Sequence, residues 1–219
     1  MMKKAGEKSA IRSTNKRWQI LSAAEKEFAC NGFSGARMKT IAQAAGLDKA
    51  TIYHYFKTKE ELYNTVLEDA IGAFIALTSK GLDHDTDPGD ELTEFMSVLI
   101  DFLDKHRSFA LILRREFSSP GTARSKFLKQ ALAPLIYQVR KYIEDSVLIG
   151  EMRRVDSEHV IYSIYEMLFG YFTMNRDIAS LFFEQKPYSK QMLERRREHI
   201  AMVIRRLLVP EEMMDGMKR

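Results

Sequence analysis

The stretch that decides the fold runs from Met38 to Lys59 and reads MKTIAQAAGLDKATIYHYFKTK. Gly46 suits a turn that needs a positive φ between two helices. Asp48 is a favoured N-cap for the helix after the turn, and Ile52 is spaced to pack back onto the helix before it. This order predicts a helix-turn-helix whose second helix, Lys49–Phe56, is of the kind that enters a DNA major groove.

The composition around this stretch is that of a helical globular protein. The 219 residues are 45% hydrophobic and include only 5 prolines, which favours helices over a turn-rich β fold. Cys30 is the single cysteine, so an internal disulfide and a thiolate metal cluster are excluded, and a reducing cytoplasm is the expected setting. No apolar run is long enough to span a membrane, and none follows the basic N-terminus as a secretory signal would require.

Positive charge is concentrated at the N-terminal end of the chain. Residues 1–59 contain 12 Lys and Arg against 4 Asp and Glu, a net charge of +8. The other 160 residues contain 22 against 26, a net charge of −4. An uneven solvated surface would explain this difference equally well by itself, but its coincidence with the helix-turn-helix indicates that this end meets a polyanion.

Helical periodicity continues beyond the motif, and no strand-like alternation or internal repeat is present. Gly32 is expected to end the first helix, and Thr58 with Glu61 has the pattern of a capping box that opens a long helix. Asp87 and Pro88 match the N-cap and first position of another helix. Helices are expected at about 15–30, 37–45, 49–56, 58–82, 91–105, 109–117, 123–148 (kinked or split at Pro134), 157–183 and 189–208.

We therefore expect an all-α fold: a three-helix helix-turn-helix bundle joined by one long helix to a larger C-terminal bundle for ligand binding and dimerisation. A continuous helix between the two bundles can transmit movement from one to the other. The expected parts are a flexible basic arm at 1–14, a DNA-binding domain at 15–60 extended by the linking helix 58–82, a regulatory and dimerisation domain at 83–208, and a tail at 209–219.

The motif resembles the DNA-binding domain of the TetR (tetracycline-repressor) family. The resemblance covers about Asn15 to Thr78 and includes Gly32-Phe33, the helix-turn-helix, its Tyr-His-Tyr-Phe ending and the Lys-Glu-Glu-Leu start of the next helix. Arg37 departs from it, since the family often has Thr or Ser capping that helix and Arg cannot cap in the same way. Arg37 could contact a phosphate instead, or the backbone of Gly35-Ala36 could serve as the cap.

The resemblance implies a sequence-specific regulator of transcription, a repressor that a small ligand releases from a near-palindromic operator. Lysines would contact phosphates, while His54 and Ala50 would meet base edges. His54 could also be an exposed residue with no role. The expected DNA-binding residues are Arg37, Thr40, Lys49, Ala50, Thr51, Tyr53, His54, Lys57 and Lys59.

The helix over Ser157–Phe183 has apolar residues nearly all round, so it must be buried on both sides. We expect it to form a two-fold dimer interface with the last helix, whose arginines lie outside its apolar stripe. These arginines could indicate nucleic acid, but a solvated face balanced by Glu194 and Glu198 explains them better. The expected interface residues are Ile161, Tyr165, Leu168, Phe172, Leu193, Ile200, Val203, Ile204 and Leu207.

The second bundle is rich in Met, Phe and Tyr, side chains that suit an adaptable pocket for an apolar or aromatic effector. For any single residue, ordinary core packing is the simpler interpretation. The candidate pocket residues are Met96, Leu99, Phe102, Leu103, Leu113, Phe117, Tyr137, Met167, Tyr171 and Met174.

Metal, cofactor and catalytic sites find little support in the sequence. Asp83, Asp85, Asp87 and Glu94 match a calcium-loop template, but Pro88 stands where the template needs Gly, so an acidic loop with a helix cap is the better interpretation. The histidines lack ligand spacing, and no nucleophile motif or Gly-rich phosphate loop is present, which disfavours an enzyme. The expected partners are operator DNA, a second copy of the chain and a small effector, without a membrane. The competing hypothesis is a ligand-independent architectural DNA-binding protein.

Overall fold

The computed structural model describes residues 2–78, 82, 87–119 and 121–212, with every side chain in these ranges except those of residues 2–14 and 176. All regular structure in these ranges is helical, which confirms the predicted all-α fold. The helices are α1 (Met2–Gly35), α2 (Met38–Ala45), α3 (Lys49–Tyr55), α4 (Lys59–Thr78), α5 (Pro88–Lys105), α6 (Arg107–Phe117), α7 (Ala123–Leu148), α8 (Ser157–Thr173), α9 (Arg176–Ala179) and α10 (Lys190–Leu208).

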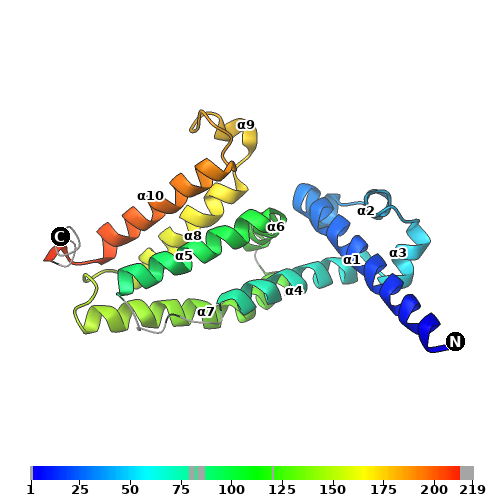
Figure 1. Cartoon of the computed structure of the whole chain (residues 1–219), viewed down its shortest axis with the longest axis horizontal. Coiled ribbons are helices and arrows are strands. Elements are labelled where there is room, and N and C mark those ends of the chain that lie inside the picture. The colour runs from blue at the N-terminus through cyan, green and yellow to red at the C-terminus, as the bar shows by residue number, and fades with distance from the viewer. Residues whose placement is uncertain (1, 79–81, 83–86, 120, 213–219) are drawn as a thin grey trace.

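The helices form a small head and a larger bundle. Helices α1, α2 and α3 lie together at one end of the molecule, and α4 runs from this head along the larger bundle beside α7 (Figure 1). Helix α10 packs on α5, and α8 packs on α6 and α7. Because α1 also packs against α6, the head touches the bundle in a second place besides α4.

Helix α1 differs from the prediction at its N-terminal end. It begins at Met2, so it includes the residues 2–14 for which a flexible basic arm was expected. This segment contains Lys, Glu and Ala without a proline, and these residues favour a helix. Near its other end Gly32 has φ 67 and ψ 176, which interrupts the helix where the sequence predicted its end. Trp18 of this helix is 67% exposed.

The turn between α2 and α3 has the predicted chemistry. Gly46 is left-handed, with φ 66 and ψ 30, and the next residue, Leu47, donates its N–H to the carbonyl of Ala42 at 3.0 Å. Asp48 caps α3 by accepting the Thr51 N–H at 2.6 Å. These local contacts fix the angle at which α3 leaves α2.

The start of α4 is capped by a variant of the predicted box. The Glu61 N–H donates to the Thr58 hydroxyl at 3.0 Å, but the Glu61 carboxylate accepts from the N–H of Lys57 at 2.8 Å, one residue earlier than in the usual motif. Helix α4 ends at Thr78, whose hydroxyl donates to the Phe74 carbonyl at 3.0 Å. The predicted helix over 58–82 also includes residues 79–81, which lie outside the described residues.

Two predictions about the larger bundle have different outcomes. Asp87 caps α5 by accepting the N–H groups of Gly89 and Asp90 at 2.9 and 3.1 Å, with Pro88 in the first turn as predicted. A kink or a split was predicted at Pro134, and the helix is not split, because α7 runs through this residue. Pro134 lies on the exposed side of α7, where water can satisfy the carbonyl that its missing N–H leaves free.

Helix α8 ends at Thr173, ten residues before the predicted end at 183. Met174 is extended, with φ −66 and ψ 133, and Asn175 caps the short helix α9 that follows. The Tyr188 hydroxyl lies 3.3 Å from the carbonyl oxygen of Met174. A side chain from the segment before α10 therefore helps to satisfy the carbonyls at this helix end, a contact that helical periodicity cannot indicate.

One continuous hydrophobic core extends through the head and the bundle. At their junction the rings of Phe28 and Tyr63 meet edge to face, with centroids 4.7 Å apart. Phe109 of α6 is completely buried in the same core. Because no solvent layer separates these residues, a shift of α6 acts directly on α1 and α4.

Candidate functional site

Helix α3 presents a polar face to solvent. Lys49, Ala50, Tyr53 and His54 are exposed, while Ile52 on the opposite side is completely buried. The Lys49 amino group lies 5.5 Å from the Tyr53 ring centroid. A buried anchor on one side and free donors on the other give α3 the form of a helix that can enter a major groove.

Thr51 is half-buried and partly committed to the cap. Its hydroxyl donates to Asp48 at 3.0 Å, in addition to the backbone bond that makes the cap. The backbone N–H of Thr51 is the main cause that lowers the pKa of Asp48, so the cap is ionised near neutral pH. This arrangement gives Thr51 a structural role within the predicted DNA-binding set.

The N-terminus of α2 also faces outward. Arg37 and Thr40 are exposed, and the Arg37 side chain makes no cap. The Arg37 N–H donates to the Glu27 carboxylate of α1 at 3.1 Å, a contact that the sequence did not predict. With no side chain over its first turn, α2 leaves amides that can receive a phosphate.

The two lysines at the end of the motif differ in their surroundings. Lys57 is exposed. The Lys59 amino group donates to the carbonyls of Ala36 at 3.2 Å and Ser34 at 3.5 Å, and it lies 4.7 Å from the Phe33 ring centroid. The structure thus uses Lys59 to hold the connector between α1 and α2, a role that its place in the motif did not indicate.

The predicted effector pocket is mostly packed core. Met96, Leu99 and Phe102 are buried, as are Leu103, Leu113 and Tyr171, while Met167 and Met174 are half-buried. Two assignments are wrong, because Phe117 and Tyr137 are 45% and 65% exposed. Phe117 ends α6, and Tyr137 lies on the outer face of α7, so neither can line an interior pocket formed by the others.

The predicted dimer residues also divide into two groups. Ile161, Tyr165 and Val203 are half-buried, and Leu207 is exposed. The others are buried within the chain's own bundle and pack α8 and α10 against it, so they do not form a free surface in this conformation. These residues are Leu168, Phe172, Leu193, Ile200 and Ile204. Helical periodicity shows that a face of α8 or α10 is apolar, but it does not show whether that face packs on the chain's own bundle or on a second subunit.

Two apolar residues on the outer side of the same helices were missing from the prediction. Tyr162 of α8 and Met202 of α10 are exposed. Exposed apolar residues on neighbouring helices can mark a contact with another molecule. Their positions on these two helices were visible in the sequence, but not the direction in which their side chains point.

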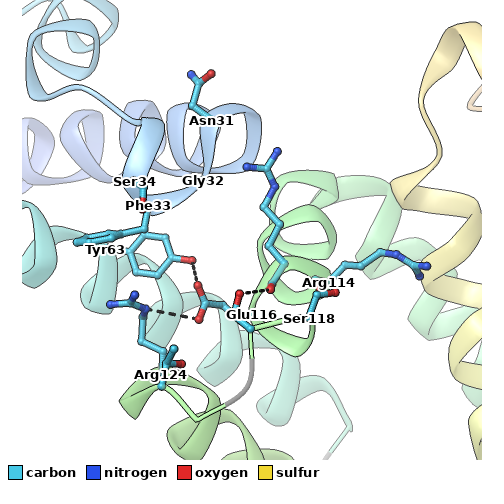
Figure 2. Close-up of a pocket in the computed structure, with 12 residues that line it drawn as sticks. Asn31, Gly32, Phe33, Ser34, Tyr63, Arg114, Glu116, Ser118 and Arg124 are labelled. Atoms are coloured by element: carbon cyan, nitrogen blue, oxygen red, sulfur yellow. Dashed lines mark hydrogen bonds and ion pairs between the residues drawn. The ribbon is translucent and has the colours of Figure 1, made fainter.

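A cleft of about 460 Å³ lies where the head meets the bundle. None of the predicted pocket residues lines it. Figure 2 shows Tyr63 of α4 and Arg124 of α7 on either side of Glu116 of α6. The lining residues are Asn31, Gly32, Phe33, Ser34, Tyr63, Arg114, Arg115, Glu116, Ser118, Ser119, Thr122 and Arg124.

Glu116 is the central charged group of the junction. It is 6% exposed, accepts a hydrogen bond from the Tyr63 hydroxyl at 2.6 Å and faces the Arg124 Nε at 3.5 Å. Burial is the main cause that raises the pKa of Tyr63, and the Glu116 carboxylate adds to it, so Tyr63 remains a donor. Glu116 lies on the same face of α6 as the apolar residues Phe109, Ile112 and Leu113. A charged residue on an apolar face could have indicated in the sequence that Glu116 is buried and paired.

Within the described residues, no three His, Cys, Asp or Glu side chains converge as a metal site requires. The calcium-loop template depends on residues 83–86, which lie outside the described residues. None of the helices described here combines the length and the apolar character needed to cross a membrane.

Two family models match this chain. Residues 20–66 match "Bacterial regulatory proteins, tetR family", and residues 88–204 match "Tetracyclin repressor-like, C-terminal domain". The chain belongs to the TetR family. The family resemblance inferred from the sequence is confirmed, and this TetR-family chain is a helix-turn-helix DNA-binding regulator of transcription.

Similar proteins share both parts of this TetR-family chain. The HTH-type transcriptional repressor NicS of Pseudomonas putida is 29% identical over 174 residues, which cover 78% of this chain and 82% of NicS. The structure of AibR in complex with isovaleryl coenzyme A and operator DNA has a TM-score of 0.70 at 18% identity and covers 88% of this chain and 97% of AibR. FadR from Bacillus subtilis in complex with stearoyl-CoA has a TM-score of 0.59 at 20% identity, with coverage of 81% and 95%. The two structures establish a shared fold.

Proposed function

We propose that this TetR-family regulator is a repressor that binds a near-palindromic operator as a homodimer and leaves it when a small effector binds. The observation that carries the proposal is the polar face of α3, which Gly46 and Asp48 fix at the edge of the head. Two copies related by a two-fold axis would present two such helices to one duplex. The repressor would act in the cytoplasm, and we propose no catalytic activity for it.

In this proposal residues 15–60 are the DNA-binding domain, residues 83–208 the regulatory and dimerisation domain, and α4 the connection between them. Base contacts come from Ala50 and His54 on the exposed face of α3. The proposed phosphate contacts come from Arg37, Thr40, Lys49, Tyr53 and Lys57. Lys59 and Thr51, whose polar groups have internal partners, position these residues.

The dimer is proposed to form through the outer faces of α8 and α10. Ile161, Tyr165, Val203 and Leu207 remain from the predicted set, and Tyr162 and Met202 extend this surface. Leu207→Asp would place a charge in the interface, so we expect dissociation at concentrations where the wild type is a dimer. Sedimentation of both proteins measures this, and an unchanged dimer would contradict the assignment.

The effector is proposed to be a small apolar or aromatic molecule bound within the larger bundle. The supporting observation is the cluster of flexible and aromatic side chains around Met96, Leu99 and Phe102. Acyl-CoA thioesters are the first class to test, because the AibR and FadR structures contain isovaleryl-CoA and stearoyl-CoA. An effector can release the operator only if it binds the DNA-free conformation more tightly.

The decisive experiment is selection of binding sites from fragmented genomic DNA with the purified full-length protein. We expect a palindromic motif with half-sites about one helical turn apart. No enrichment over random fragments would contradict the proposal. Acyl-CoA thioesters are then titrated into the selected complex, and DNA binding that none of the tested ligands changes would favour the architectural alternative.

A further inference from the structure

We propose that the junction cleft is a binding site for a small oxyanion, a molecule carrying a carboxylate or phosphate group, and that it acts separately from the effector proposed for the bundle interior. The cleft has walls from both parts of the molecule. Residues 31–34 and Tyr63 belong to the head and α4, whereas Arg114, Arg115 and Glu116 lie at the end of α6 and Thr122 and Arg124 at the start of α7. Its volume of about 460 Å³ is sufficient for a small ligand.

Most of the charged side chains that line the cleft have a partner of opposite charge. Arg114, Arg115 and Arg124 contribute three positive charges, whereas Glu116 contributes one negative charge. Arg124 faces Glu116 and also Glu60 of α4, each at 3.5 Å, and Arg114 pairs with Glu166 of α8 at 3.2 Å. Figure 2 shows the Arg114 side chain extending away from Glu116 toward α8. The remaining positive charge is that of Arg115.

Arg115 is held in place without a counter-charge. Its Nη2 donates to the carbonyl of Cys30 at 2.8 Å, and its Nη1 lies 2.8 Å from the point that a Cβ on Gly32 would occupy. Among the described residues, no carboxylate lies within ion-pair distance of it. A guanidinium has five donors in a planar fork, so an oxyanion can occupy those that the single carbonyl leaves free.

The nearby start of α7 favours the same ligand charge. Thr122, the N-cap of this 26-residue helix, lines the cleft. The positive end of the helix dipole therefore lies at the cleft and adds to the attraction of Arg115 for an anion. The two features come from different elements, α6 and α7, and both favour negative charge.

The cleft has one wall on each side of the junction. Its affinity for a ligand therefore depends on the orientation of the head relative to the larger bundle. An oxyanion that bridges residues 31–34 and Arg115 favours the orientation in which both walls are in reach. Any difference in its affinity between the operator-bound and free conformations changes operator affinity by the same factor.

Inorganic phosphate is the test probe, with the full-length protein and chloride exchanged for phosphate at constant ionic strength. Calorimetric titration is performed on the wild type, Arg115→Gln and Arg115→Lys. Lys129→Gln, a change of an exposed α7 residue outside the cleft, removes the same charge as a control. We expect phosphate to bind the wild type and the control saturably. Binding to Arg115→Gln should be weaker by about tenfold or more. Arg115→Lys should be intermediate, because it keeps the charge and loses the fork.

Operator affinity with and without phosphate provides a second readout. It should change with phosphate in the wild type and Lys129→Gln but not in Arg115→Gln. Absence of saturable binding, or equal binding by all four proteins, would overturn the inference. An equal loss of operator affinity in all of them would also overturn it, because phosphate would then be competing at the DNA contacts. Selection of the operator without phosphate remains an independent test of the proposed function.

Discussion

The hydroxyl of Tyr63 donates to the carboxylate of Glu116 at 2.6 Å, and this bond joins α4 to α6 inside the protein. Both residues are almost completely buried. The Arg124 guanidinium completes the group, 4.6 Å from the Phe33 ring centroid and 5.2 Å from that of Tyr63. One charge-assisted hydrogen bond thus links the helix that leaves the DNA-binding head to a helix of the regulatory bundle.

Tyr63→Phe should lower the free energy of unfolding by about 1–3 kcal/mol, because it leaves the buried Glu116 carboxylate without its strongest donor. Tyr162→Phe is the matched control, since Tyr162 is exposed and its hydroxyl lies 3.4 Å from Glu166. Urea denaturation of both variants measures the difference. Equal stability of the two variants would show that the buried bond contributes nothing net.

The raised pKa of Tyr63 also predicts a loss of stability in alkali. Its contribution is complete below the ordinary tyrosine pKa of 10.0 and is lost as the pH rises toward the higher pKa of the folded state. Above pH 10 the stability of Tyr63→Phe should therefore fall less steeply than that of the wild type. Burial and the Glu91 carboxylate also raise the pKa of Tyr142. Because Tyr142 is present in both proteins, it does not account for a difference between them. Denaturation curves from about pH 8 to about pH 11 measure the slopes, and parallel slopes would contradict the assignment.

Lys57→Ala should lower DNA affinity, whereas Lys59→Ala should lower the stability of the head. Lys57 is exposed, so its loss should weaken binding to all DNA sequences and reduce the salt slope by about 1. Lys59 holds the carbonyls of Ser34 and Ala36, so its loss should lower the stability of the head by about 1 kcal/mol. Anisotropy titrations at several salt concentrations and thermal unfolding separate the two effects. If both variants lost only affinity, the internal role of Lys59 would be wrong.

His54→Ala should change sequence preference, because the exposed His54 imidazole is placed to meet a base edge. We expect affinity for the operator to fall by about 1–3 kcal/mol and affinity for random DNA to stay within error. Competition binding with both DNAs measures this. An equal loss on both would assign His54 to the backbone or to no contact.

Two glycines with a positive φ should respond differently to alanine. Gly46 has φ 66 and no atom within 4 Å of a built Cβ, so Gly46→Ala should cost only the strain of a left-handed residue, about 1 kcal/mol. Gly32 has φ 67 and ψ 176, a conformation that essentially only glycine adopts, and its Cβ would lie 2.8 Å from the Arg115 guanidinium. Gly32→Ala should therefore cost more and move Arg115. Chemical denaturation compares the two variants, and equal costs would contradict this prediction.

The helix-turn-helix was predictable because each of its signals is local. Gly46, Asp48 and the Thr58–Glu61 pair act on backbone groups within five residues, so their identity and spacing are enough. The same holds for Asp87 and Pro88 at the start of α5. Local chemistry was insufficient at the end of α8, where the hydroxyl of the distant Tyr188 donates to the Tyr171 carbonyl of the last turn at 3.1 Å.

By itself the sequence determined the all-α class, the position of α3 and the family of the chain, because helical periodicity and capping are short-range properties. The tertiary structure decided the assignment of individual side chains. It buried Leu168 and Ile200 within their own bundle, exposed Phe117 and Tyr137, and placed Lys59 on the backbone of the head. It also brought Tyr63, Glu116 and Arg124 together from three helices. The physical reason is that a helical repeat fixes which residues share a face, whereas only packing fixes what that face meets.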